Sequence, residues 1–151
     1  MQNIYSLDQQ NNLLSRSYPN IRVIVIDDSV LDVLLHKKIV AHHLPGSKVL
    51  GFHEASKALE FIMQNHDDNY QNLILLDIQM PVMDGYEFLA RLHTCEPKVK
   101  DACKIVMISS AHSEYSHIKH PSTALIQHKL PKPLLPANFK DAVKSIYSFS
   151  I

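Results

Sequence analysis

The stretch LILLDIQMPVMDG, residues 73–85, indicates the fold of the whole chain. Four apolar residues run directly into Asp77, as expected where a buried strand ends. A proline follows, and then come Asp84 and Gly85, which are residues typical of turns and helix starts. The stretch therefore predicts a buried strand, a loop and a helix, with a carboxylate at the point where the strand ends.

Short apolar runs and helix-like segments alternate along the rest of the chain. The predicted strands are residues 21–26, 47–52, 72–77, 104–110 and 123–130. The predicted helices are residues 29–44, 54–65, 85–93, 113–120 and 136–149. Strands that alternate with helices form right-handed βαβ units. We therefore expect an α/β fold, a doubly wound (βα)5 flavodoxin-like sandwich with a five-stranded parallel sheet in the strand order 2-1-3-4-5.

Apolar side chains recur at helical spacing in four of the predicted helices, on faces that we expect to cover the sheet. They are Leu31, Leu34, Leu35 and Ile39; Ala55, Leu59, Ile62 and Met63; Phe88, Leu89 and Leu92; and Phe139, Val143 and Ile146. In the last strand, Pro131 has no backbone N–H, so we expect strand pairing to end by Leu130.

The length and composition of the chain predict one globular domain. A chain of 151 residues with 46% hydrophobic residues is long enough for its own core. Residues 1–19 are polar and rich in Asn and Gln. We expect these residues to form a flexible N-terminal extension, followed by the domain over residues 20–151.

Charge and cysteine content restrict the classes of partner and compartment. Fifteen basic residues balance fifteen acidic ones, which gives no electrostatic reason for binding nucleic acid or an anionic membrane. Cys95 and Cys103 form no Cys-x-x-Cys pair, so we expect reduced thiols. Residues 1–19 hold no apolar core of signal-peptide length, and no run approaches the ~20 apolar residues of a membrane-spanning helix. We expect a cytoplasmic protein without membrane attachment or direct nucleic-acid binding.

Polar residues stand where four of the predicted strands end. Asp27 and Asp28 follow the first strand, and Asp77 ends the third. Ser109 lies at the end of the fourth strand, and Lys132 follows the fifth. Any one of these aspartates alone would be a turn residue or a helix cap. Because the carboxyl ends of parallel strands share one edge of the sheet, we expect all five residues to meet there.

Such a cluster suits the handling of a phosphoryl group. Carboxylates prefer a hard cation such as Mg²⁺. Lys132 supplies a positive charge and Ser109 a hydroxyl donor. Asp77 is the best candidate for the nucleophile, because it ends a strand that we expect to be central and shielded.

These residues resemble the response-regulator receiver domain, from about Arg22 to Tyr147. The matching pieces are VIVIDDS, LILLDIQMPVMDGYEFL, IVMISSAH and LPKPL. The resemblance implies that Asp77 is the phosphoacceptor and that Mg²⁺ is the cofactor. It further implies the metal ligands, which are Asp28 directly, Asp27 mainly through water, Asp77, and the backbone carbonyl of Gln79.

The resemblance also implies roles for the remaining residues and partners. Ser109 takes the hydroxyl position and Lys132 the lysine position, with a cis bond to Pro133. The phosphodonor would be a histidine kinase or a histidine phosphotransfer protein. We expect a stand-alone receiver whose only chemistry is its own phosphorylation and autodephosphorylation. It would signal through an unknown downstream protein or a phosphorelay, and phosphorylation would favour a dimer.

One departure from the family pattern leaves an alternative open. The aromatic switch position, three residues before Lys132, is occupied by Lys129. His128 and Tyr115 are the candidates that could replace the aromatic switch. A pseudo-receiver that acts as a scaffold without phosphorylation is therefore the first alternative.

Two further alternatives use other chemistry. An aspartyl-phosphate phosphohydrolase would need a second acid two residues after Asp77, where this chain has Gln79. A nucleotide- or flavin-binding module would need clustered glycines, but the three glycines of the chain are dispersed. We therefore rank the phosphohydrolase and the nucleotide- or flavin-binding module below the receiver domain.

Overall fold

The computed structural model describes residues 20–110 and 120–148 of the chain. Its five strands form one parallel sheet in the order β2-β1-β3-β4-β5, which confirms the predicted fold and strand order. The strands are β1 (Asn20–Ile26), β2 (Lys48–Phe52), β3 (Tyr70–Asp77), β4 (Cys103–Ser109) and β5 (Ile126–Pro131). Strand β3 is therefore the central strand of the sheet.

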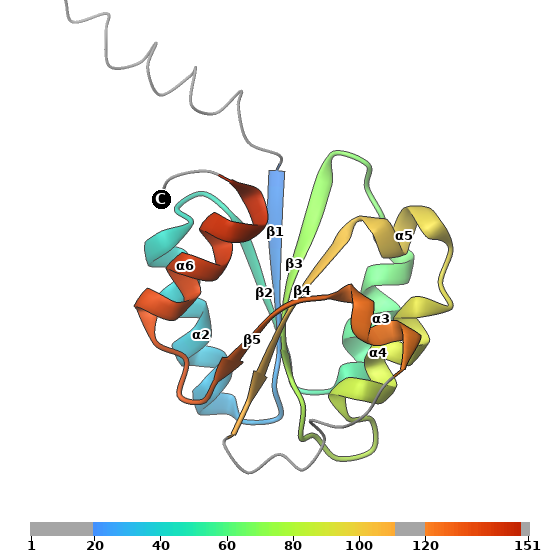
Figure 1. Cartoon of the computed structure of the whole chain (residues 1–151), viewed down its shortest axis with the longest axis horizontal. Helices are drawn as coiled ribbons and strands as arrows, with labels where there is room; N and C mark the ends of the chain where they lie inside the picture. The colour runs from blue at the N-terminus through green and yellow to red at the C-terminus, as the bar shows by residue number, and fades with distance from the viewer. Residues whose placement is uncertain (1–19, 111–119, 149–151) are drawn as a thin grey trace, which may run out of the picture.

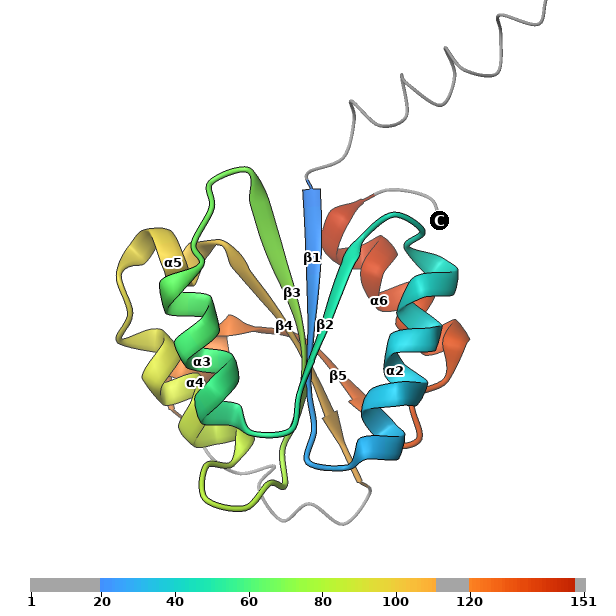
Figure 2. The same ribbon diagram turned by 180° about the vertical axis from the view of Figure 1, so that it is seen from behind.

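Helices cover both faces of this sheet, as Figure 1 and the reverse view in Figure 2 show. Helices α2 (Val30–His43) and α6 (Pro136–Tyr147) lie on one face. Helices α3 (Ala55–Gln64), α4 (Gly85–His93) and α5 (Pro97–Asp101) lie on the other. A short 3₁₀ helix, η2 (Pro121–Leu125), precedes β5. Within the described ranges, no helix has the length and apolarity needed to cross a membrane.

The two faces of the central strands pack into two separate cores, which explains their continuous apolar runs. Ile74 and Leu76 of β3 belong to the core under α3 and α4. Leu73 and Leu75 belong to the core under α2 and α6. Phe88 and Phe139 are the large buried side chains that α4 and α6 contribute to these cores.

The sequence around Asp84-Gly85 starts α4 directly against the end of β3. The Asp84 side chain caps the helix by accepting a hydrogen bond from the backbone N–H of Glu87 at 2.8 Å. The Gly85 N–H donates to the carbonyl of Ile78 at 2.8 Å. A Cβ on residue 85 would lie 2.6 Å from the carbonyl oxygen of Asp77. Only glycine lets the helix approach the strand end this closely.

The apolar face that we predicted for the first helix is wrong in part. Leu31, Leu34 and Leu35 are 77%, 52% and 42% exposed. The face on the sheet instead carries Val33, His36, Ile39 and Val40. Since apolar residues lie on two faces of α2, their spacing alone could not select the inner one. Met63 of α3, also predicted on an inner face, is 55% exposed.

The last strand also differs from its prediction. Residues 123–125 belong to η2, so β5 starts later than expected. Pairing also extends past Leu130, because Pro131 lies opposite Ser109. The next backbone N–H, that of Lys132, donates to the Ser109 carbonyl at 2.7 Å. The backbone N–H groups of neighbouring residues in a strand point to opposite sides. Since the Lys132 N–H points toward β4, the Pro131 nitrogen points toward the free edge of the sheet, where no N–H donor is needed.

One helix was missed, and two predictions fall on residues that the structure does not describe. Helix α5 was not predicted. The helix expected over residues 113–120 falls almost entirely outside the described residues, and so does the extension over residues 1–19. The N-terminal extension therefore stays a prediction.

Candidate functional site

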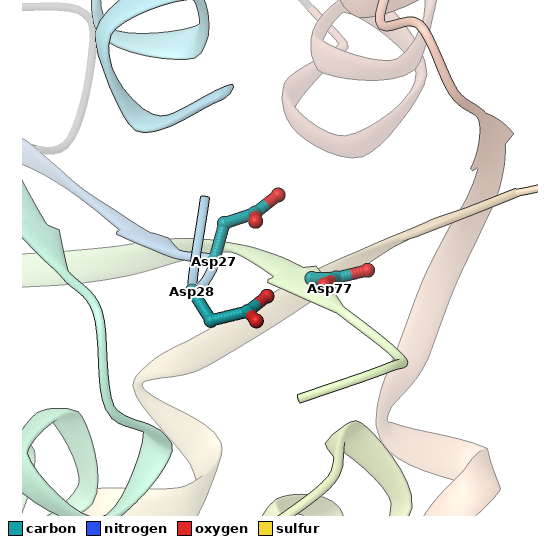
Figure 3. Close-up of side chains that lie close together, drawn as sticks. All are labelled: Asp27, Asp28 and Asp77. Atoms are coloured by element: carbon teal, nitrogen blue, oxygen red, sulfur yellow. The ribbon is translucent and has the colours of Figure 1, made fainter. Parts of the chain in front are cut away.

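The ends of β1 and β3 bring three aspartates together. Ile26 of β1 lies opposite Leu76 of β3, so the residues that follow, Asp27 and Asp77, are level with each other. Asp28 is the next residue along the chain. Each of the three offers a carboxylate oxygen, and these oxygens lie within 4.8 Å of one another. Figure 3 shows the three side chains at the adjoining strand ends, as the sequence led us to expect.

The end of β5 adds a positive charge to this cluster. The Nζ atom of Lys132 lies 2.7 Å from Oδ2 of Asp27 and 3.3 Å from Oδ1 of Asp77. The backbone N–H of Lys132 is held by the carbonyl of Ser109, and the Lys132–Pro133 peptide bond is cis, as the resemblance implied. Polar contacts thus hold both the backbone N–H and the ammonium group of Lys132 in place.

Burial makes the charges of this site unusually costly. Asp27 and Asp77 are 1% and 5% exposed, whereas Asp28 is exposed. Burial, together with repulsion from Asp27, raises the pKa of Asp77 to about 6, although Lys132 opposes the rise. Burial lowers the pKa of Lys132, but hydrogen bonding and attraction from Asp27 and Asp77 outweigh it and raise the pKa above its usual value. The negative charge of the cluster is therefore only partly compensated.

The donor set fits a hard divalent cation. A single ammonium group, paired with Asp27 and Asp77, accompanies the three carboxylates, so the cluster keeps an excess of negative charge that a divalent cation would neutralise. Asp28 is exposed, so the cluster is open to solvent on the side where Asp28 lies. Mg²⁺ prefers oxygen ligands of this kind and keeps several waters, which suits a cluster open on one side.

Gln79 lies next to the cluster through its backbone. Its backbone N–H donates a hydrogen bond to the Asp77 carboxylate. Its side chain accepts a hydrogen bond from the Ser110 hydroxyl at 3.5 Å. That the carbonyl of Gln79 is a metal ligand stays a prediction.

Ser109 lies at the rim of the cluster. It is the last residue of β4, one position beyond Ile108, which pairs with Asp77. Its carbonyl accepts a hydrogen bond from the N–H of Lys132, and no hydrogen bond of its side chain is described. The role predicted for its hydroxyl therefore stays a prediction.

Two residues of α2 that the sequence did not point to lie at the site. Oδ2 of Asp32 is 3.2 Å from Nζ of Lys132. His36 is 2% exposed. Burial lowers the pKa of His36, against the attraction of Asp27 and Asp32, and so favours the uncharged ring. An acid in the first turn of a helix is also expected from the helix dipole alone, so the sequence carried no separate signal for Asp32.

Lys129, at the position where the family has an aromatic residue, is exposed on β5 opposite Met107. His128, one of the two candidates to replace the aromatic switch, lies beside it opposite Val106. Tyr115, the other candidate, lies outside the described residues.

A comparison with sequence families matches the family described as "Response regulator receiver domain" to residues 23–144. A protein-glutamate methylesterase/protein-glutamine glutaminase from Desulfotalea psychrophila is 38% identical over 103 residues, which are 66% of this chain and 25% of that protein. The chain spans a quarter to a third of the length of curated relatives of this kind.

Solved structures share the fold. A response regulator receiver protein from Dyadobacter fermentans is 27% identical with a TM-score of 0.67, over 82% of this chain and 95% of that one. The response regulator protein TrrA from Thermotoga maritima, solved in complex with Mg²⁺-BeF, is 24% identical with a TM-score of 0.64, over 83% of this chain and 97% of that one. The similarity to TrrA shows a shared fold and nothing further.

Proposed function

Since the chain belongs to the response regulator receiver domain family, we propose that it takes a phosphoryl group from a phosphohistidine of a partner protein onto Asp77. The observation that carries the proposal is the position of Asp77. This carboxylate ends the central strand, is 5% exposed, and lies among two other carboxylates and the Lys132 ammonium group.

The transfer moves one phosphoryl group between two side chains. An Oδ atom of Asp77 forms a bond to phosphorus while the N–P bond of the phosphohistidine breaks, and the electron pair of that bond stays on the imidazole nitrogen. Asp77 must be ionised to attack. Its ionised form is costly because of burial and Asp27, and the nearby ammonium group of Lys132 offsets part of that cost.

Each neighbouring residue has a role in this proposal. Lys132 donates hydrogen bonds to the phosphoryl oxygens as charge develops on them. The Gln79 N–H keeps the Asp77 side chain oriented through the hydrogen bond that they share. The Ser109 hydroxyl, at the end of the adjacent strand, would donate to the transferred group.

We propose Mg²⁺ as the cofactor, held by Asp27, Asp28 and Asp77 with the carbonyl of Gln79. The mutual distances of the three carboxylates support this assignment. When bound, the ion would supply positive charge to the phosphoryl oxygens. The same fold in TrrA was solved with Mg²⁺-BeF, which makes fluoroberyllate a suitable probe for this chain.

The proposed donor is a histidine kinase or a histidine phosphotransfer protein. Its phosphohistidine must reach Asp77, so the donor protein has to cover the rim of the site. Exposed apolar side chains lie in the segments at that rim, which supports protein contact there. They are Val30 and Leu31 at the start of α2, Val82 in the loop after β3, and Leu135 before α6.

The output of the proposed receiver is protein contact or onward phosphotransfer. Exposed Lys129 cannot act as a buried aromatic switch, so we place the phosphorylation-dependent change in the Ser109 and Lys132 segments. The methylesterase activity of the curated relatives is not carried over, since the chain spans only a quarter to a third of their length. We restrict its chemistry to phosphorylation and autodephosphorylation of Asp77.

Intact mass measurement tests the proposal. The protein is incubated with Mg²⁺ and acetyl phosphate, beside the variant Asp77→Asn. We expect a mass gain of one phosphoryl group in the wild type and none in the variant. A gain in both proteins would move the acceptor to another residue, and a gain in neither would favour the pseudo-receiver scaffold. Hydrolysis of p-nitrophenyl phosphate, which we expect to be absent, would favour a phosphohydrolase.

A further inference from the structure

Lys132 contacts a third carboxylate that lies outside the cluster of Asp27, Asp28 and Asp77. Oδ2 of Asp32, in the first turn of α2, accepts a hydrogen bond from Nζ of Lys132 at 3.2 Å. We propose that Asp32 is a positioning residue for Lys132. It draws the ammonium group toward α2, and it competes for that group with a phosphoryl group on Asp77. This inference rests on the proposed function.

The number of donors on the ammonium group supports competition. A lysine ammonium has three N–H donors. In this structure Nζ of Lys132 faces three carboxylates, at 2.7 Å for Asp27, 3.2 Å for Asp32 and 3.3 Å for Asp77. A phosphoryl group on Asp77 brings additional oxygens, so the ammonium group can bind more than one of them only by releasing another partner.

Asp32 is the partner that is not needed elsewhere in the site. Asp27 belongs to the set of three carboxylates that fits a divalent cation, and Asp32 does not. Its side chain is 37% exposed, whereas that of Asp27 is 1% exposed. Asp32 can therefore remain charged in water when Lys132 leaves it, while Asp27 cannot lose its partner without a large cost.

The ordinary explanation of Asp32 is helix capping, and it predicts something different. The N–H of Asp32 donates to Oγ of the N-cap residue Ser29 at 3.2 Å, and an acid at this position favours the helix dipole. Neither effect depends on Lys132. A capping residue would therefore show no coupling to Lys132, whereas a positioning residue would.

The first test is a double-mutant cycle in the metal-free protein, with Asp32→Asn, Lys132→Met and both together. Urea unfolding gives the equilibrium constant of each variant. We expect the effects of the two substitutions to be coupled by about fivefold in that constant. Additive effects would show that Asp32 serves only the helix, and would overturn the proposal.

The second test measures binding of fluoroberyllate, a stand-in for the phosphoryl group, at saturating Mg²⁺. We expect Asp32→Asn to bind this probe about fivefold more tightly than the wild type, because a donor of Lys132 becomes free. Mg²⁺ alone should bind no more tightly to the variant. A variant that merely distorts α2 would lose affinity for both ligands.

Matched variants complete the design. Asp32→Glu keeps the charge and should stay within about twofold of the wild type in fluoroberyllate affinity. Asp101→Asn removes an acid from the exposed surface of α5 and should leave both affinities unchanged. Equal or weaker fluoroberyllate binding by Asp32→Asn overturns this inference alone. If the wild type binds no fluoroberyllate and gains no phosphoryl mass, the proposed function fails as well.

Discussion

Lys132 and Asp27 form a partly buried ion pair, with Nζ 2.7 Å from Oδ2, that joins the end of β5 to the end of β1. Removing the ammonium group would leave the Asp27 carboxylate, which is 1% exposed, without its cation. We expect Lys132→Met to lower the free energy of unfolding by about 3 kcal/mol in metal-free buffer at pH 7. Urea denaturation measures this loss.

The control for this prediction is Lys129→Met. Lys129 is an exposed lysine on β5, three residues before Lys132, and its loss should change stability by no more than about 0.5 kcal/mol. Addition of Mg²⁺ should restore part of the stability of Lys132→Met, because the cation compensates the same carboxylates. Equal losses of stability in Lys132→Met and Lys129→Met would mean that the pair of Lys132 with Asp27 contributes no more to stability than an exposed lysine does.

The raised pKa of Asp77 predicts a pH dependence of stability. This pKa is about 6 in the folded protein against an ordinary value of 3.8, so the folded state keeps a proton that the unfolded state has lost between these values. Stability therefore falls as the pH rises through this window, and the full cost of about 2–3 kcal/mol is present at pH 7. Asp77→Asn should remove this cost.

The measurement is a series of urea titrations of wild type and Asp77→Asn, without Mg²⁺, between pH 4 and 7. We expect the variant to be the more stable protein at pH 7 and the difference to shrink toward zero near pH 4. A difference that stays constant over the whole range would contradict a folding cost at the Asp77 carboxylate.

Mg²⁺ should stabilise the folded protein through the three carboxylates. At a concentration of 100 times its dissociation constant, it should add about 2.7 kcal/mol to the free energy of unfolding, and a chelator should remove this gain. Asp28→Asn should weaken Mg²⁺ binding on the order of tenfold. Urea unfolding with and without Mg²⁺ checks the first value and calorimetric titration the second, with Asp101→Asn as the control for loss of a surface charge.

Val82 gives a prediction about backbone strain. It has a φ of 68° and is fully exposed, in a three-residue turn that the Met83 N–H closes on the Pro81 carbonyl at 2.8 Å. A β-branched residue in this region is strained by about 1–3 kcal/mol, whereas glycine costs about 0.5–1 kcal/mol through the entropy of the unfolded chain. We therefore expect Val82→Gly to stabilise the protein by about 1 kcal/mol.

Val30→Gly is the opposite case. Val30 is also exposed, but it lies in the first turn of a helix, so glycine should cost about 0.5–1 kcal/mol there. Thermal unfolding of both variants compares the two positions. Loss of stability in both would show that the turn at Val82 holds no strain.

The sequence predicted the fold and the edge of the sheet that holds the site, because these follow from local patterns. The four residues before Asp77 are all apolar, and Asp84-Gly85 marks the start of α4. The end of the strand and the start of the helix could therefore both be predicted. Since the ends of parallel strands share one edge, Asp27 and Lys132 could be placed together without any coordinates.

The contacts of α2 could not be predicted in the same way. Leu31 and Leu34 fit an inward face by spacing as well as Val33 does, and it is the packing of α2 on the sheet that separates them. In that packing, a Cβ on Gly51 of β2 would lie 2.6 Å from the Val33 side chain. The pairing of Asp32 with Lys132 joins residues 100 positions apart, and no local pattern encodes it.

The separation of Asp27 and Lys132 by 105 positions has a consequence for biosynthesis. The proposed acceptor Asp77 leaves the ribosome well before Lys132, so a nascent chain holds the three aspartates for a time without the lysine that pairs with them when the chain is folded. Only a chain translated past β5 can complete the pocket. On the proposed function, competence to receive a phosphoryl group would thus arise only after β5 and Lys132 have been made, and a chain truncated before them would lack the complete site.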